Sequence, residues 1–350
     1  MTRLGHLPVL GWDIGGVNTK AALVDRGLEP TPGIRSMSTA FAIQHDPAAL
    51  VPTLAAMRAA LDIPTGCSHA VTMTAELSQA FRTKREGVAF VLDALATAFP
   101  ADPLHVYTAT GRFVTPIHAR SHPLEAAASN WMATAAFVAR AVSDAILIDI
   151  GTTSTDIIPL ERGRVAARGR TDPHRLSTGE LLYTGAVRTP IEALVREVPL
   201  WDGTARVSAE GFATIGDALV WLGRLDPADY TAATSDGRPP HREFAGERLA
   251  RVVCGDREML DDRAIDRIAE AVSEAQVRLV TAGVRQVRAA FPGATTAVVT
   301  GLGDFIASEA AARAGLTVIP LAERLGAAAR TAPAAAVAWL LGDDLARVTR

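Results

Sequence analysis

Two Asp-Ile-Gly turns stand out among the residues that could carry out chemistry. The run VLGWDIGGVNTKAALVD (residues 9–25) places Asp13 at the end of an apolar stretch, and ILIDIGTTSTDIIPL (residues 146–160) does the same with Asp149. Glycine lets backbone N–H groups approach a ligand closely, and consecutive amides form a concavity suited to phosphate. A carboxylate at the end of a strand can hold Mg²⁺, largely through water. These turns therefore predict binding of a phosphate chain together with its metal.

The neighbouring residues of each turn supply further groups for this purpose. The predicted phosphate-binding residues are Gly15, Gly16, Asn18, Thr19, Lys20, Gly151, Thr152, Thr153 and Ser154. We expect Asp13 and Asp149 to hold Mg²⁺, with Asp156 as a further carboxylate. The alternative for either turn alone is an ordinary tight hairpin, because Asp, Gly and Asn are common turn residues. Two such turns about one domain apart favour the phosphate-binding interpretation.

A third Gly-rich junction, TGLGD, contains Gly301, Gly303 and Asp304 and lies between a strand pattern and a helix pattern. Taken alone it is weak support for a ligand site.

Alternating strand and helix patterns surround the turns. Apolar spacing predicts helices over residues 46–62, 87–100, 123–142, 264–291 and 306–315, and strands over 67–74, 103–114, 295–300 and 316–320. Residues 156–170 have the pattern of a strand, a turn and a second strand. We expect residues 21–25 to pair with the strand before Asp13. The pattern suggests a duplicated unit with lobes at residues 1–143 and 144–350, and a helical and loop insertion at about 171–262. An Ala-rich helix near residues 332–341 is expected to pack on a domain, the first lobe being one candidate.

Composition excludes several classes of protein. The chain has 350 residues, 49% of them hydrophobic, and a net charge of −3, so no nucleic-acid or membrane partner is expected. Cys67 and Cys254 lie far apart, which favours a reducing cytosol over a disulfide framework. The first residues show no signal-peptide pattern, and the apolar tract at 332–341 is too short to span a bilayer. We expect a cytoplasmic protein; a homodimer is left open.

The three Gly-rich segments resemble those of the actin/Hsp70/sugar-kinase superfamily. DIGGVNTK is similar to its first phosphate loop, DIGTTSTD to its second, and VVTGLGDFIA, less strictly, to its adenosine-binding turn. The resemblance implies an α/β protein with a duplicated actin-like, ribonuclease H-like ATPase fold. It also implies two lobes with a central cleft, across which the first two loops face each other.

Three further segments resemble the hydantoinase/oxoprolinase-like branch of this superfamily: TMTAELSQAFRTKREGV (72–88), EAAASNW (125–131) and STGELLYTGAVRTP (177–190). More narrowly, they are similar to the family of tetrahydromethanopterin-linked one-carbon transfer pathway proteins. Its archaeal members are methanofuran-biosynthesis synthases that join an aminomethylfuran-methyl diphosphate to γ-glutamyltyramine. The resemblance implies formation of an aryl ether with release of diphosphate, from a small-molecule diphosphate and a phenolic acceptor carrying tyramine or tyrosine. Mg²⁺ is the implied cofactor, and ATP is left open but not required.

A phenol has an unperturbed pKa near 10, so a general base would assist its attack. Glu76, Glu125 and Asp156 are candidates, and the sequence does not choose among them. Glu125 could instead support the N-terminus of the helix predicted at residues 123–142, and Glu76 could be a surface helix residue.

Residues in the family-like segments are candidates for binding the substrate. They are Thr74, Lys84, Arg85, Asn130, Thr178, Glu180, Tyr183 and Arg188. Lys84 and Arg85 could equally be solvated charges. Thr178 and Glu180 could be capping residues, because Ser177 followed by Glu180 has the spacing of a capping box. Trp131 is expected in the core.

Two rival functions remain open at this stage. One is an ATP-dependent amidohydrolase of the hydantoinase/oxoprolinase type, which stoichiometric ATP turnover would favour. The other is a non-enzymatic nucleotide-binding regulator, which nucleotide-dependent association without turnover would favour.

Overall fold

The computed structural model describes residues 8–25, 33–63 and 66–348. Two compact units divide the chain: one holds Met1–Leu147, Ile158–Arg175 and Ile319–Arg350, and the other holds Ile148–Ile157 and Leu176–Val318. Residues 1–7, on which the prediction about a signal peptide partly depends, lie outside the described residues. Among the residues described, no helix combines the length and the apolar character needed to cross a membrane.

The first sheet has the strand order β3-β2-β1-β4-β5-β6. Its strands are β1 Val9–Ile14, β2 Asn18–Asp25, β3 Gly33–Ala40, β4 Ser68–Met73, β5 Leu104–Tyr107 and β6 Phe113–Val114. Strands β1, β2 and β3 are antiparallel neighbours, whereas β4 runs parallel to β1 and β5 runs parallel to β4. The first turn is shorter than predicted, because Asn18, Thr19 and Lys20 already belong to β2.

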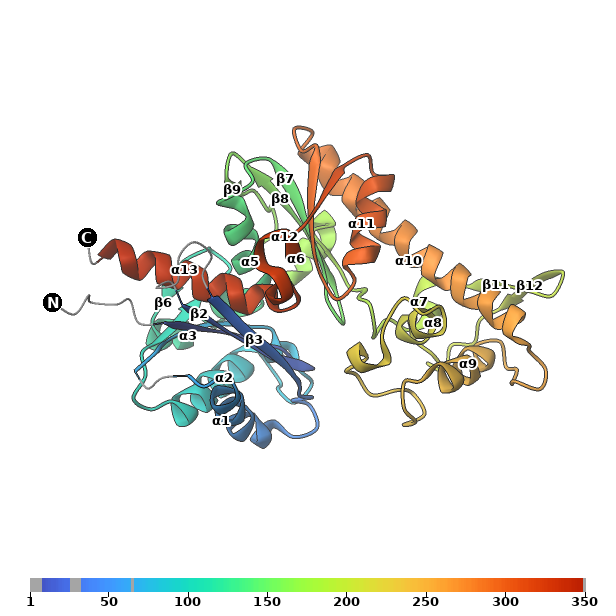
Figure 1. The fold of residues 1–350 in the computed structure, drawn as a ribbon, viewed down its shortest axis with the longest axis horizontal. Helices are drawn as coiled ribbons and strands as arrows, with labels where there is room; N and C mark the ends of the chain where they lie inside the picture. The colour runs from blue at the N-terminus through green and yellow to red at the C-terminus, as the bar shows by residue number, and fades with distance from the viewer. Residues whose placement is uncertain (1–7, 26–32, 64–65, 349–350) are drawn as a thin grey trace. The chain divides into compact units, whose positions relative to one another are not determined.

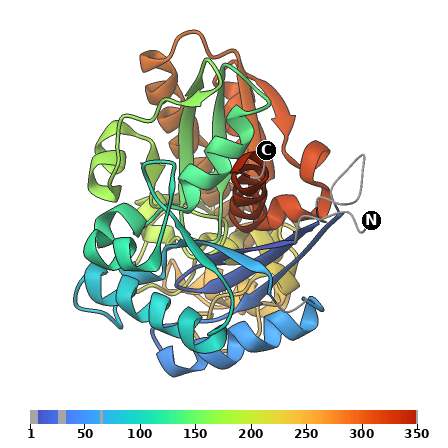
Figure 2. The same ribbon diagram turned by 90° about the vertical axis from the view of Figure 1, so that its left-hand side faces the viewer.

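Different helices cover the two faces of β1, as Figures 1 and 2 show. Trp12 is fully buried in the core formed with α1 (Leu50–Ala60) and α2 (Lys84–Ala98). Gly11 faces the opposite way, because side chains alternate along a strand. A Cβ on Gly11 would lie 1.9 Å from the carbonyl oxygen of Ala334 in α13 (Ala332–Val348). Glycine at this position therefore lets α13 pack directly against the strand that leads to Asp13.

The helix predicted over residues 123–142 is interrupted, which corrects that prediction. Helix α4 spans Pro123–Ala126 and α5 spans Asn130–Ala139. Between them Ala128 has a φ of +48°, a left-handed conformation that ends a helix. Because the helix is broken here, the Ala128 backbone N–H donates to Oε1 of Glu76 and not to a carbonyl of the helix.

The second sheet repeats the order of the first as β10-β8-β7-β13-β14, with β9 also pairing with β8. The strands are β7 Ala145–Ile150, β8 Thr155–Glu161, β9 Arg164–Val165, β10 Leu181–Leu182, β13 Thr296–Gly301 and β14 Thr317–Pro320. In both sheets the strand that ends in Asp-Ile lies between its hairpin partner and a strand from later in the chain. The predicted duplicated α/β fold is confirmed.

The predicted insertion is mostly helical, with one hairpin that the sequence did not reveal. It contains α6 Asp172–Thr178, α7 Ile191–Leu194, α8 Ile215–Trp221 and α9 Arg242–Arg251, and the hairpin of β11 Glu197–Leu200 with β12 Gly203–Arg206. A fully buried ion pair, Arg248 Nε to Asp217 Oδ1 at 2.7 Å, joins α9 to α8. Both helices pack on α10 (Asp262–Ala290), which also contacts α11 (Asp304–Arg313).

Candidate active site

The first Asp-Ile-Gly turn holds a buried, partly satisfied carboxylate. Asp13 is 3% exposed, and its Oδ2 accepts from Lys20 Nζ at 3.3 Å. Its Oδ1 is buried and has no hydrogen-bond partner within the part of the chain that the structure describes. Gly15 N–H donates to the Asn18 carbonyl at 3.1 Å, and a Cβ on Gly15 would lie 2.5 Å from that same oxygen. The buried Oδ1 is therefore an acceptor that a bound ion or water could satisfy.

The segment after β4 lies beside this turn. Thr74 N–H donates to the Ile14 carbonyl at 2.9 Å, and Thr74 Oγ1 is 3.6 Å from the position that a Cβ on Gly15 would take. Because β1 and β4 are parallel neighbours, their carboxyl ends meet at one edge of the sheet. Ser129 joins this edge through its side-chain hydrogen bond with Thr72 at 3.0 Å.

Glu76 is a buried carboxylate on the short 3₁₀ helix Ala75–Leu77 that follows Thr74. Its side chain is fully buried; Oε1 accepts from Ala128 N–H at 3.0 Å and lies 3.7 Å from Lys84 Nζ. Its Oε2 has no hydrogen-bond partner among the residues placed in the structure. Burial raises the pKa of Glu76 to about 7, although the Lys84 ammonium opposes this shift. The alternative that Glu76 is a surface helix residue is therefore wrong.

Lys84 joins Glu76 to a second carboxylate. Its Nζ lies 2.7 Å from Oδ2 of Asp172, the first residue of α6. Nη1 of Arg175 lies 3.9 Å from the other oxygen of Asp172, and the buried Arg175 guanidinium is 4.2 Å from the centre of the Trp131 ring. Lys84 is therefore more than a solvated charge, and Trp131 is a core residue as predicted.

The predicted capping box at Ser177 and Glu180 is wrong. Ser177 and Thr178 form the end of α6, and Glu180 precedes strand β10. The pairing of Leu181 with Asp156 draws this segment into the second sheet, which overrides the local capping signal. Glu180 is buried, and its carbonyl accepts from Ile157 N–H at 2.9 Å.

Glu125 is a partly exposed carboxylate that pairs with an arginine and contacts a histidine. Its Oε2 accepts from Arg112 Nη2 at 2.9 Å and lies 3.5 Å from His118 Nε2. The Arg112 hydrogen bond, followed by the contact with His118, holds the pKa of Glu125 below its ordinary value. Of the two remaining candidates in the first unit, Arg85 is exposed, and Asn130 Oδ1 accepts from the backbone N–H of Trp131.

The second turn contacts the other two glycine-rich segments of its own unit. The Thr152 carbonyl accepts from the backbone N–H groups of both Val187 and Arg188, at 3.2 and 3.1 Å. A Cβ on Gly185 would lie 2.5 Å from Thr153 N, and one on Gly301 would lie 2.5 Å from Asp149 Oδ1. Three predicted segments are thus brought together around Asp149.

The remaining predicted residues of this unit occupy the same neighbourhood. Gly151 N–H donates to the Ser154 carbonyl at 3.0 Å, and Gly303 N–H donates to the Ile150 carbonyl at 2.9 Å. Asp156 is buried, whereas Tyr183, Arg188 and Asp304 are exposed.

The described residues contain no group of three or more His, Cys, Asp or Glu side chains placed to hold a metal ion. The described residues therefore do not form a closed protein cage for a metal ion. Asp13 and Asp149 belong to different compact units, and their joint binding of Mg²⁺ stays a prediction.

The sequence did not identify Asp172 or Gln276 as parts of these sites. Asp172 precedes a proline at the start of α6, where it resembles an ordinary helix-starting residue. Gln276 Nε2 donates to Thr184 Oγ1 at 2.9 Å and to the Gly185 carbonyl at 2.8 Å, which supports the loop at the second turn. A buried polar residue on the apolar side of the long helix α10 was the available signal for Gln276.

The two sheets of matching strand order, each with an Asp-Ile-Gly turn after a central strand, define a protein with the duplicated actin-like ATPase fold. A nucleotide-free structure of acetone carboxylase has this fold as well, with a TM-score of 0.55 and 10% identity over 95% of this chain and 69% of that one. The chain belongs to the hydantoinase/oxoprolinase family, whose profile matches residues 68–343.

Two curated relatives carry the name (4-{4-[2-(gamma-L-glutamylamino)ethyl]phenoxymethyl}furan-2-yl)methanamine synthase. The protein from Methanocaldococcus jannaschii is 36% identical over 278 residues, which is 79% of this chain and 83% of that protein. The protein from Methanococcus vannielii is 33% identical over 205 residues, 57% of this chain and 91% of that protein.

Proposed function

We propose that this protein is a transferase that forms an aryl ether in the biosynthesis of a methanofuran-type cofactor. The phenol oxygen of γ-glutamyltyramine, or of a tyrosine analogue, attacks the CH₂ of an aminomethylfuran-methyl diphosphate. The new C–O bond forms as the bond from that carbon to the diphosphate oxygen breaks. The phenol proton passes to a base, and diphosphate leaves with the electron pair.

The observation that carries this proposal is the 36% identity to a protein named as the corresponding synthase, over most of both chains. The printed product contains a phenoxymethyl-furan ether, which is the bond that this reaction forms. The chain is accordingly an enzyme of the synthase class. We place the reaction in one-carbon metabolism on the same ground, and we propose a cytosolic location from the two distant cysteines.

The first turn supports the departure of diphosphate. Asp13 Oδ1 is a buried oxygen that lacks a partner among the described residues, and Lys20 Nζ lies beside the same carboxylate. Mg²⁺ commonly uses one or two protein carboxylates and completes its shell with water and substrate phosphate oxygens. Asp13 would hold such an ion, which supplies charge neutralisation to the diphosphate, while Lys20 and the turn amides bind phosphate oxygens. The reaction requires no nucleotide.

Glu76 is the carboxylate that we assign as the general base. Its raised pKa of about 7 leaves it partly protonated near neutral pH, where a base is most effective. Its buried Oε2 has no hydrogen-bond partner among the described residues and would accept the phenol proton, whereas Glu125 is committed to Arg112 and His118. Ala128 N–H and Lys84 hold the other oxygen of Glu76 in place.

A direct assay tests the proposal. The purified protein is incubated with Mg²⁺, the aminomethylfuran-methyl diphosphate and γ-glutamyltyramine, without ATP, and diphosphate and product mass are measured. Asp13→Ala is expected to lower the rate by roughly 10²-fold or more. Asp93→Ala serves as the matched control, because its side chain is 69% exposed in the same unit.

Each outcome of this assay separates the alternatives. Ether formed without nucleotide, and lost in Asp13→Ala but not in Asp93→Ala, supports the synthase and the role of the turn. No ether from the tyramine or the tyrosine acceptor, together with ATP hydrolysis that depends on an added cyclic amide, would reject it in favour of a hydrolase.

A further inference from the structure

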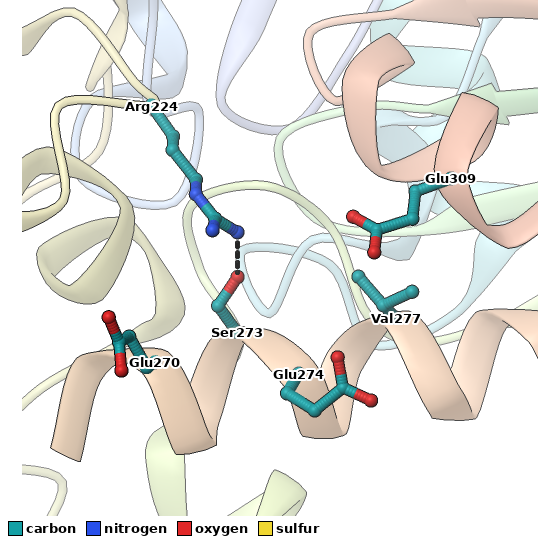
Figure 3. Close-up of a pocket in the computed structure, with 6 residues that line it drawn as sticks. All are labelled: Arg224, Glu270, Ser273, Glu274, Val277 and Glu309. Atoms are coloured by element: carbon teal, nitrogen blue, oxygen red, sulfur yellow. Dashed lines mark hydrogen bonds between the residues drawn. The ribbon is translucent and has the colours of Figure 1, made fainter. Parts of the chain in front are cut away.

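The second unit contains a pocket of about 250 Å³ against α10. None of its lining residues belongs to a glycine-rich turn; they are Arg224, Glu270, Ser273, Glu274, Val277 and Glu309. Figure 3 shows that Arg224 and Glu309 approach the same stretch of α10 from two other segments of the chain. The lining is dominated by charged side chains, so the pocket is suited to a charged ligand and not to an apolar one.

Two of the three carboxylates in this lining share one arginine, Arg313. Arg313 Nη1 and Nη2 donate to the two oxygens of Glu274, at 2.7 and 2.9 Å. Arg313 Nη2 also donates to Glu309 Oε1 at 2.5 Å. These contacts fix the wall between α10 and α11, and the Arg313 guanidinium offsets one of the two negative charges on that side of the pocket.

The remaining two charges of the lining have opposite signs. Arg224 Nη1 donates to Ser273 Oγ at 2.9 Å, a neutral acceptor that is itself 3% exposed. Neither Arg224 nor Glu270 makes a salt bridge with another residue in the described part of the chain. The pocket therefore presents one guanidinium and one carboxylate to a ligand: Arg224 helps to lower the pKa of Glu274 through its charge but makes no salt bridge with it, and Glu270 has no salt bridge among the described residues.

We propose that this pocket binds a zwitterionic α-amino-acid group, with the carboxylate on Arg224 and the ammonium on Glu270. Guanidinium–carboxylate and ammonium–carboxylate contacts are charge-assisted hydrogen bonds, which are the strong ones. The inference rests on the proposed function for its ligand: the γ-glutamyl amide of the acceptor leaves an α-ammonium and an α-carboxylate free. The pocket is then the site that distinguishes the γ-glutamyl acceptor from a simple phenol.

The pocket lies a short way along helix α11 from the second turn of its own unit. Helix α11 begins directly after Gly303, whose N–H donates to the Ile150 carbonyl in the second turn. Glu309 lies six residues further along, which is about 9 Å at 1.5 Å per residue.

The experiment uses a probe that carries the amino-acid group without the phenol. Binding of γ-glutamylethylamide to the full-length protein is measured by calorimetry for the wild type, Arg224→Leu and Glu270→Gln. We expect about 10- to 100-fold weaker binding in each variant. Arg263→Leu and Glu258→Gln are the controls, because both are exposed charges of the same unit outside the pocket. Circular dichroism verifies that each variant is folded.

A second measurement compares acceptors in the ether-forming assay. The pocket variants are expected to lose about 10- to 100-fold in kcat/KM with γ-glutamyltyramine and to keep the wild-type value with tyramine, which lacks the amino-acid group. No binding of the probe to the wild type, or equal binding in wild type and pocket variants, would overturn the inference. If no acceptor gives ether but the probe binds as expected, the proposed function fails and the pocket assignment stands.

Discussion

Replacing Glu76 with Gln should abolish most activity and yet stabilise the fold at alkaline pH. Glutamine has nearly the same shape but cannot accept the phenol proton, so kcat is expected to fall by roughly 10²- to 10⁴-fold. In the wild type, kcat/KM should rise with pH through about 7, where Glu76 ionises. The variant should lack this limb of the pH profile.

The effect on stability follows from the same shift in pKa. The folded-state pKa of Glu76 is about 7, above the ordinary value of 4.5. The fold therefore favours the protonated form, and that contribution is present below pH 4.5 and is lost as pH rises through 7. The difference of 2.5 pKa units corresponds to about 3 kcal/mol at 1.36 kcal/mol per unit. Glutamine stays neutral at every pH. The free energy of unfolding of the variant, relative to that of the wild type, should therefore rise by about 2 to 3 kcal/mol when the pH is raised from 5 to 8.

Urea unfolding at both pH values measures this gain. Tryptophan fluorescence is a suitable signal, because Trp12 and Trp131 are buried in the same unit as Glu76. Glu161→Gln is the control, since Glu161 is an exposed residue of that unit. A stability difference that does not change between pH 5 and pH 8 would refute the buried-carboxylate argument. A full pH–rate profile in the variant would refute the assignment of Glu76 as the base.

Three further predictions concern the elements that position the turns. Burial lowers the pKa of His69 from its ordinary value of 6.5 to about 4. The free energy of unfolding of the wild type should therefore fall by about 3 kcal/mol as the pH drops from 6.5 to 4. In urea unfolding, His69→Gln should lack this dependence of stability on pH. Gly11→Ala should cost about 1 to 3 kcal/mol or more in urea unfolding, because its Cβ would overlap the Ala334 carbonyl in α13. Gly185→Ala should lower kcat/KM roughly 10²-fold, because its Cβ would displace Thr153 N; an unchanged rate would show that this loop does not set the geometry of the turn.

The parts of the fold that the sequence predicted depend on local patterns. The Asp-Ile-Gly turns follow apolar runs, and both runs are buried strands, β1 and β7. The long apolar periodicity of α10 gave a helix at Asp262–Ala290, close to the predicted residues 264–291. These features are set by neighbours in the chain, so one sequence is enough to predict them.

The surroundings of the candidate base depend on contacts between distant residues. Glu76 is buried because Gly87 lets α2 approach it: a Cβ on Gly87 would lie 2.5 Å from Glu76 Cα. Its hydrogen bond comes from Ala128, in a helix break that contains no glycine or proline to signal it. The pairing of Lys84 with Asp172 spans 88 positions in the sequence. Sequence spacing alone therefore could not choose among Glu76, Glu125 and Asp156 as the general base.

The central claim is that a phenol oxygen displaces diphosphate from carbon, and the position of an isotope tests it most directly. The acceptor is labelled with oxygen-18 in its phenol and is converted with Mg²⁺ and the aminomethylfuran-methyl diphosphate, without nucleotide. The account predicts that the ether product retains the label and that the released diphosphate contains none. Labelled oxygen bound to phosphorus, or an unlabelled ether, would contradict it.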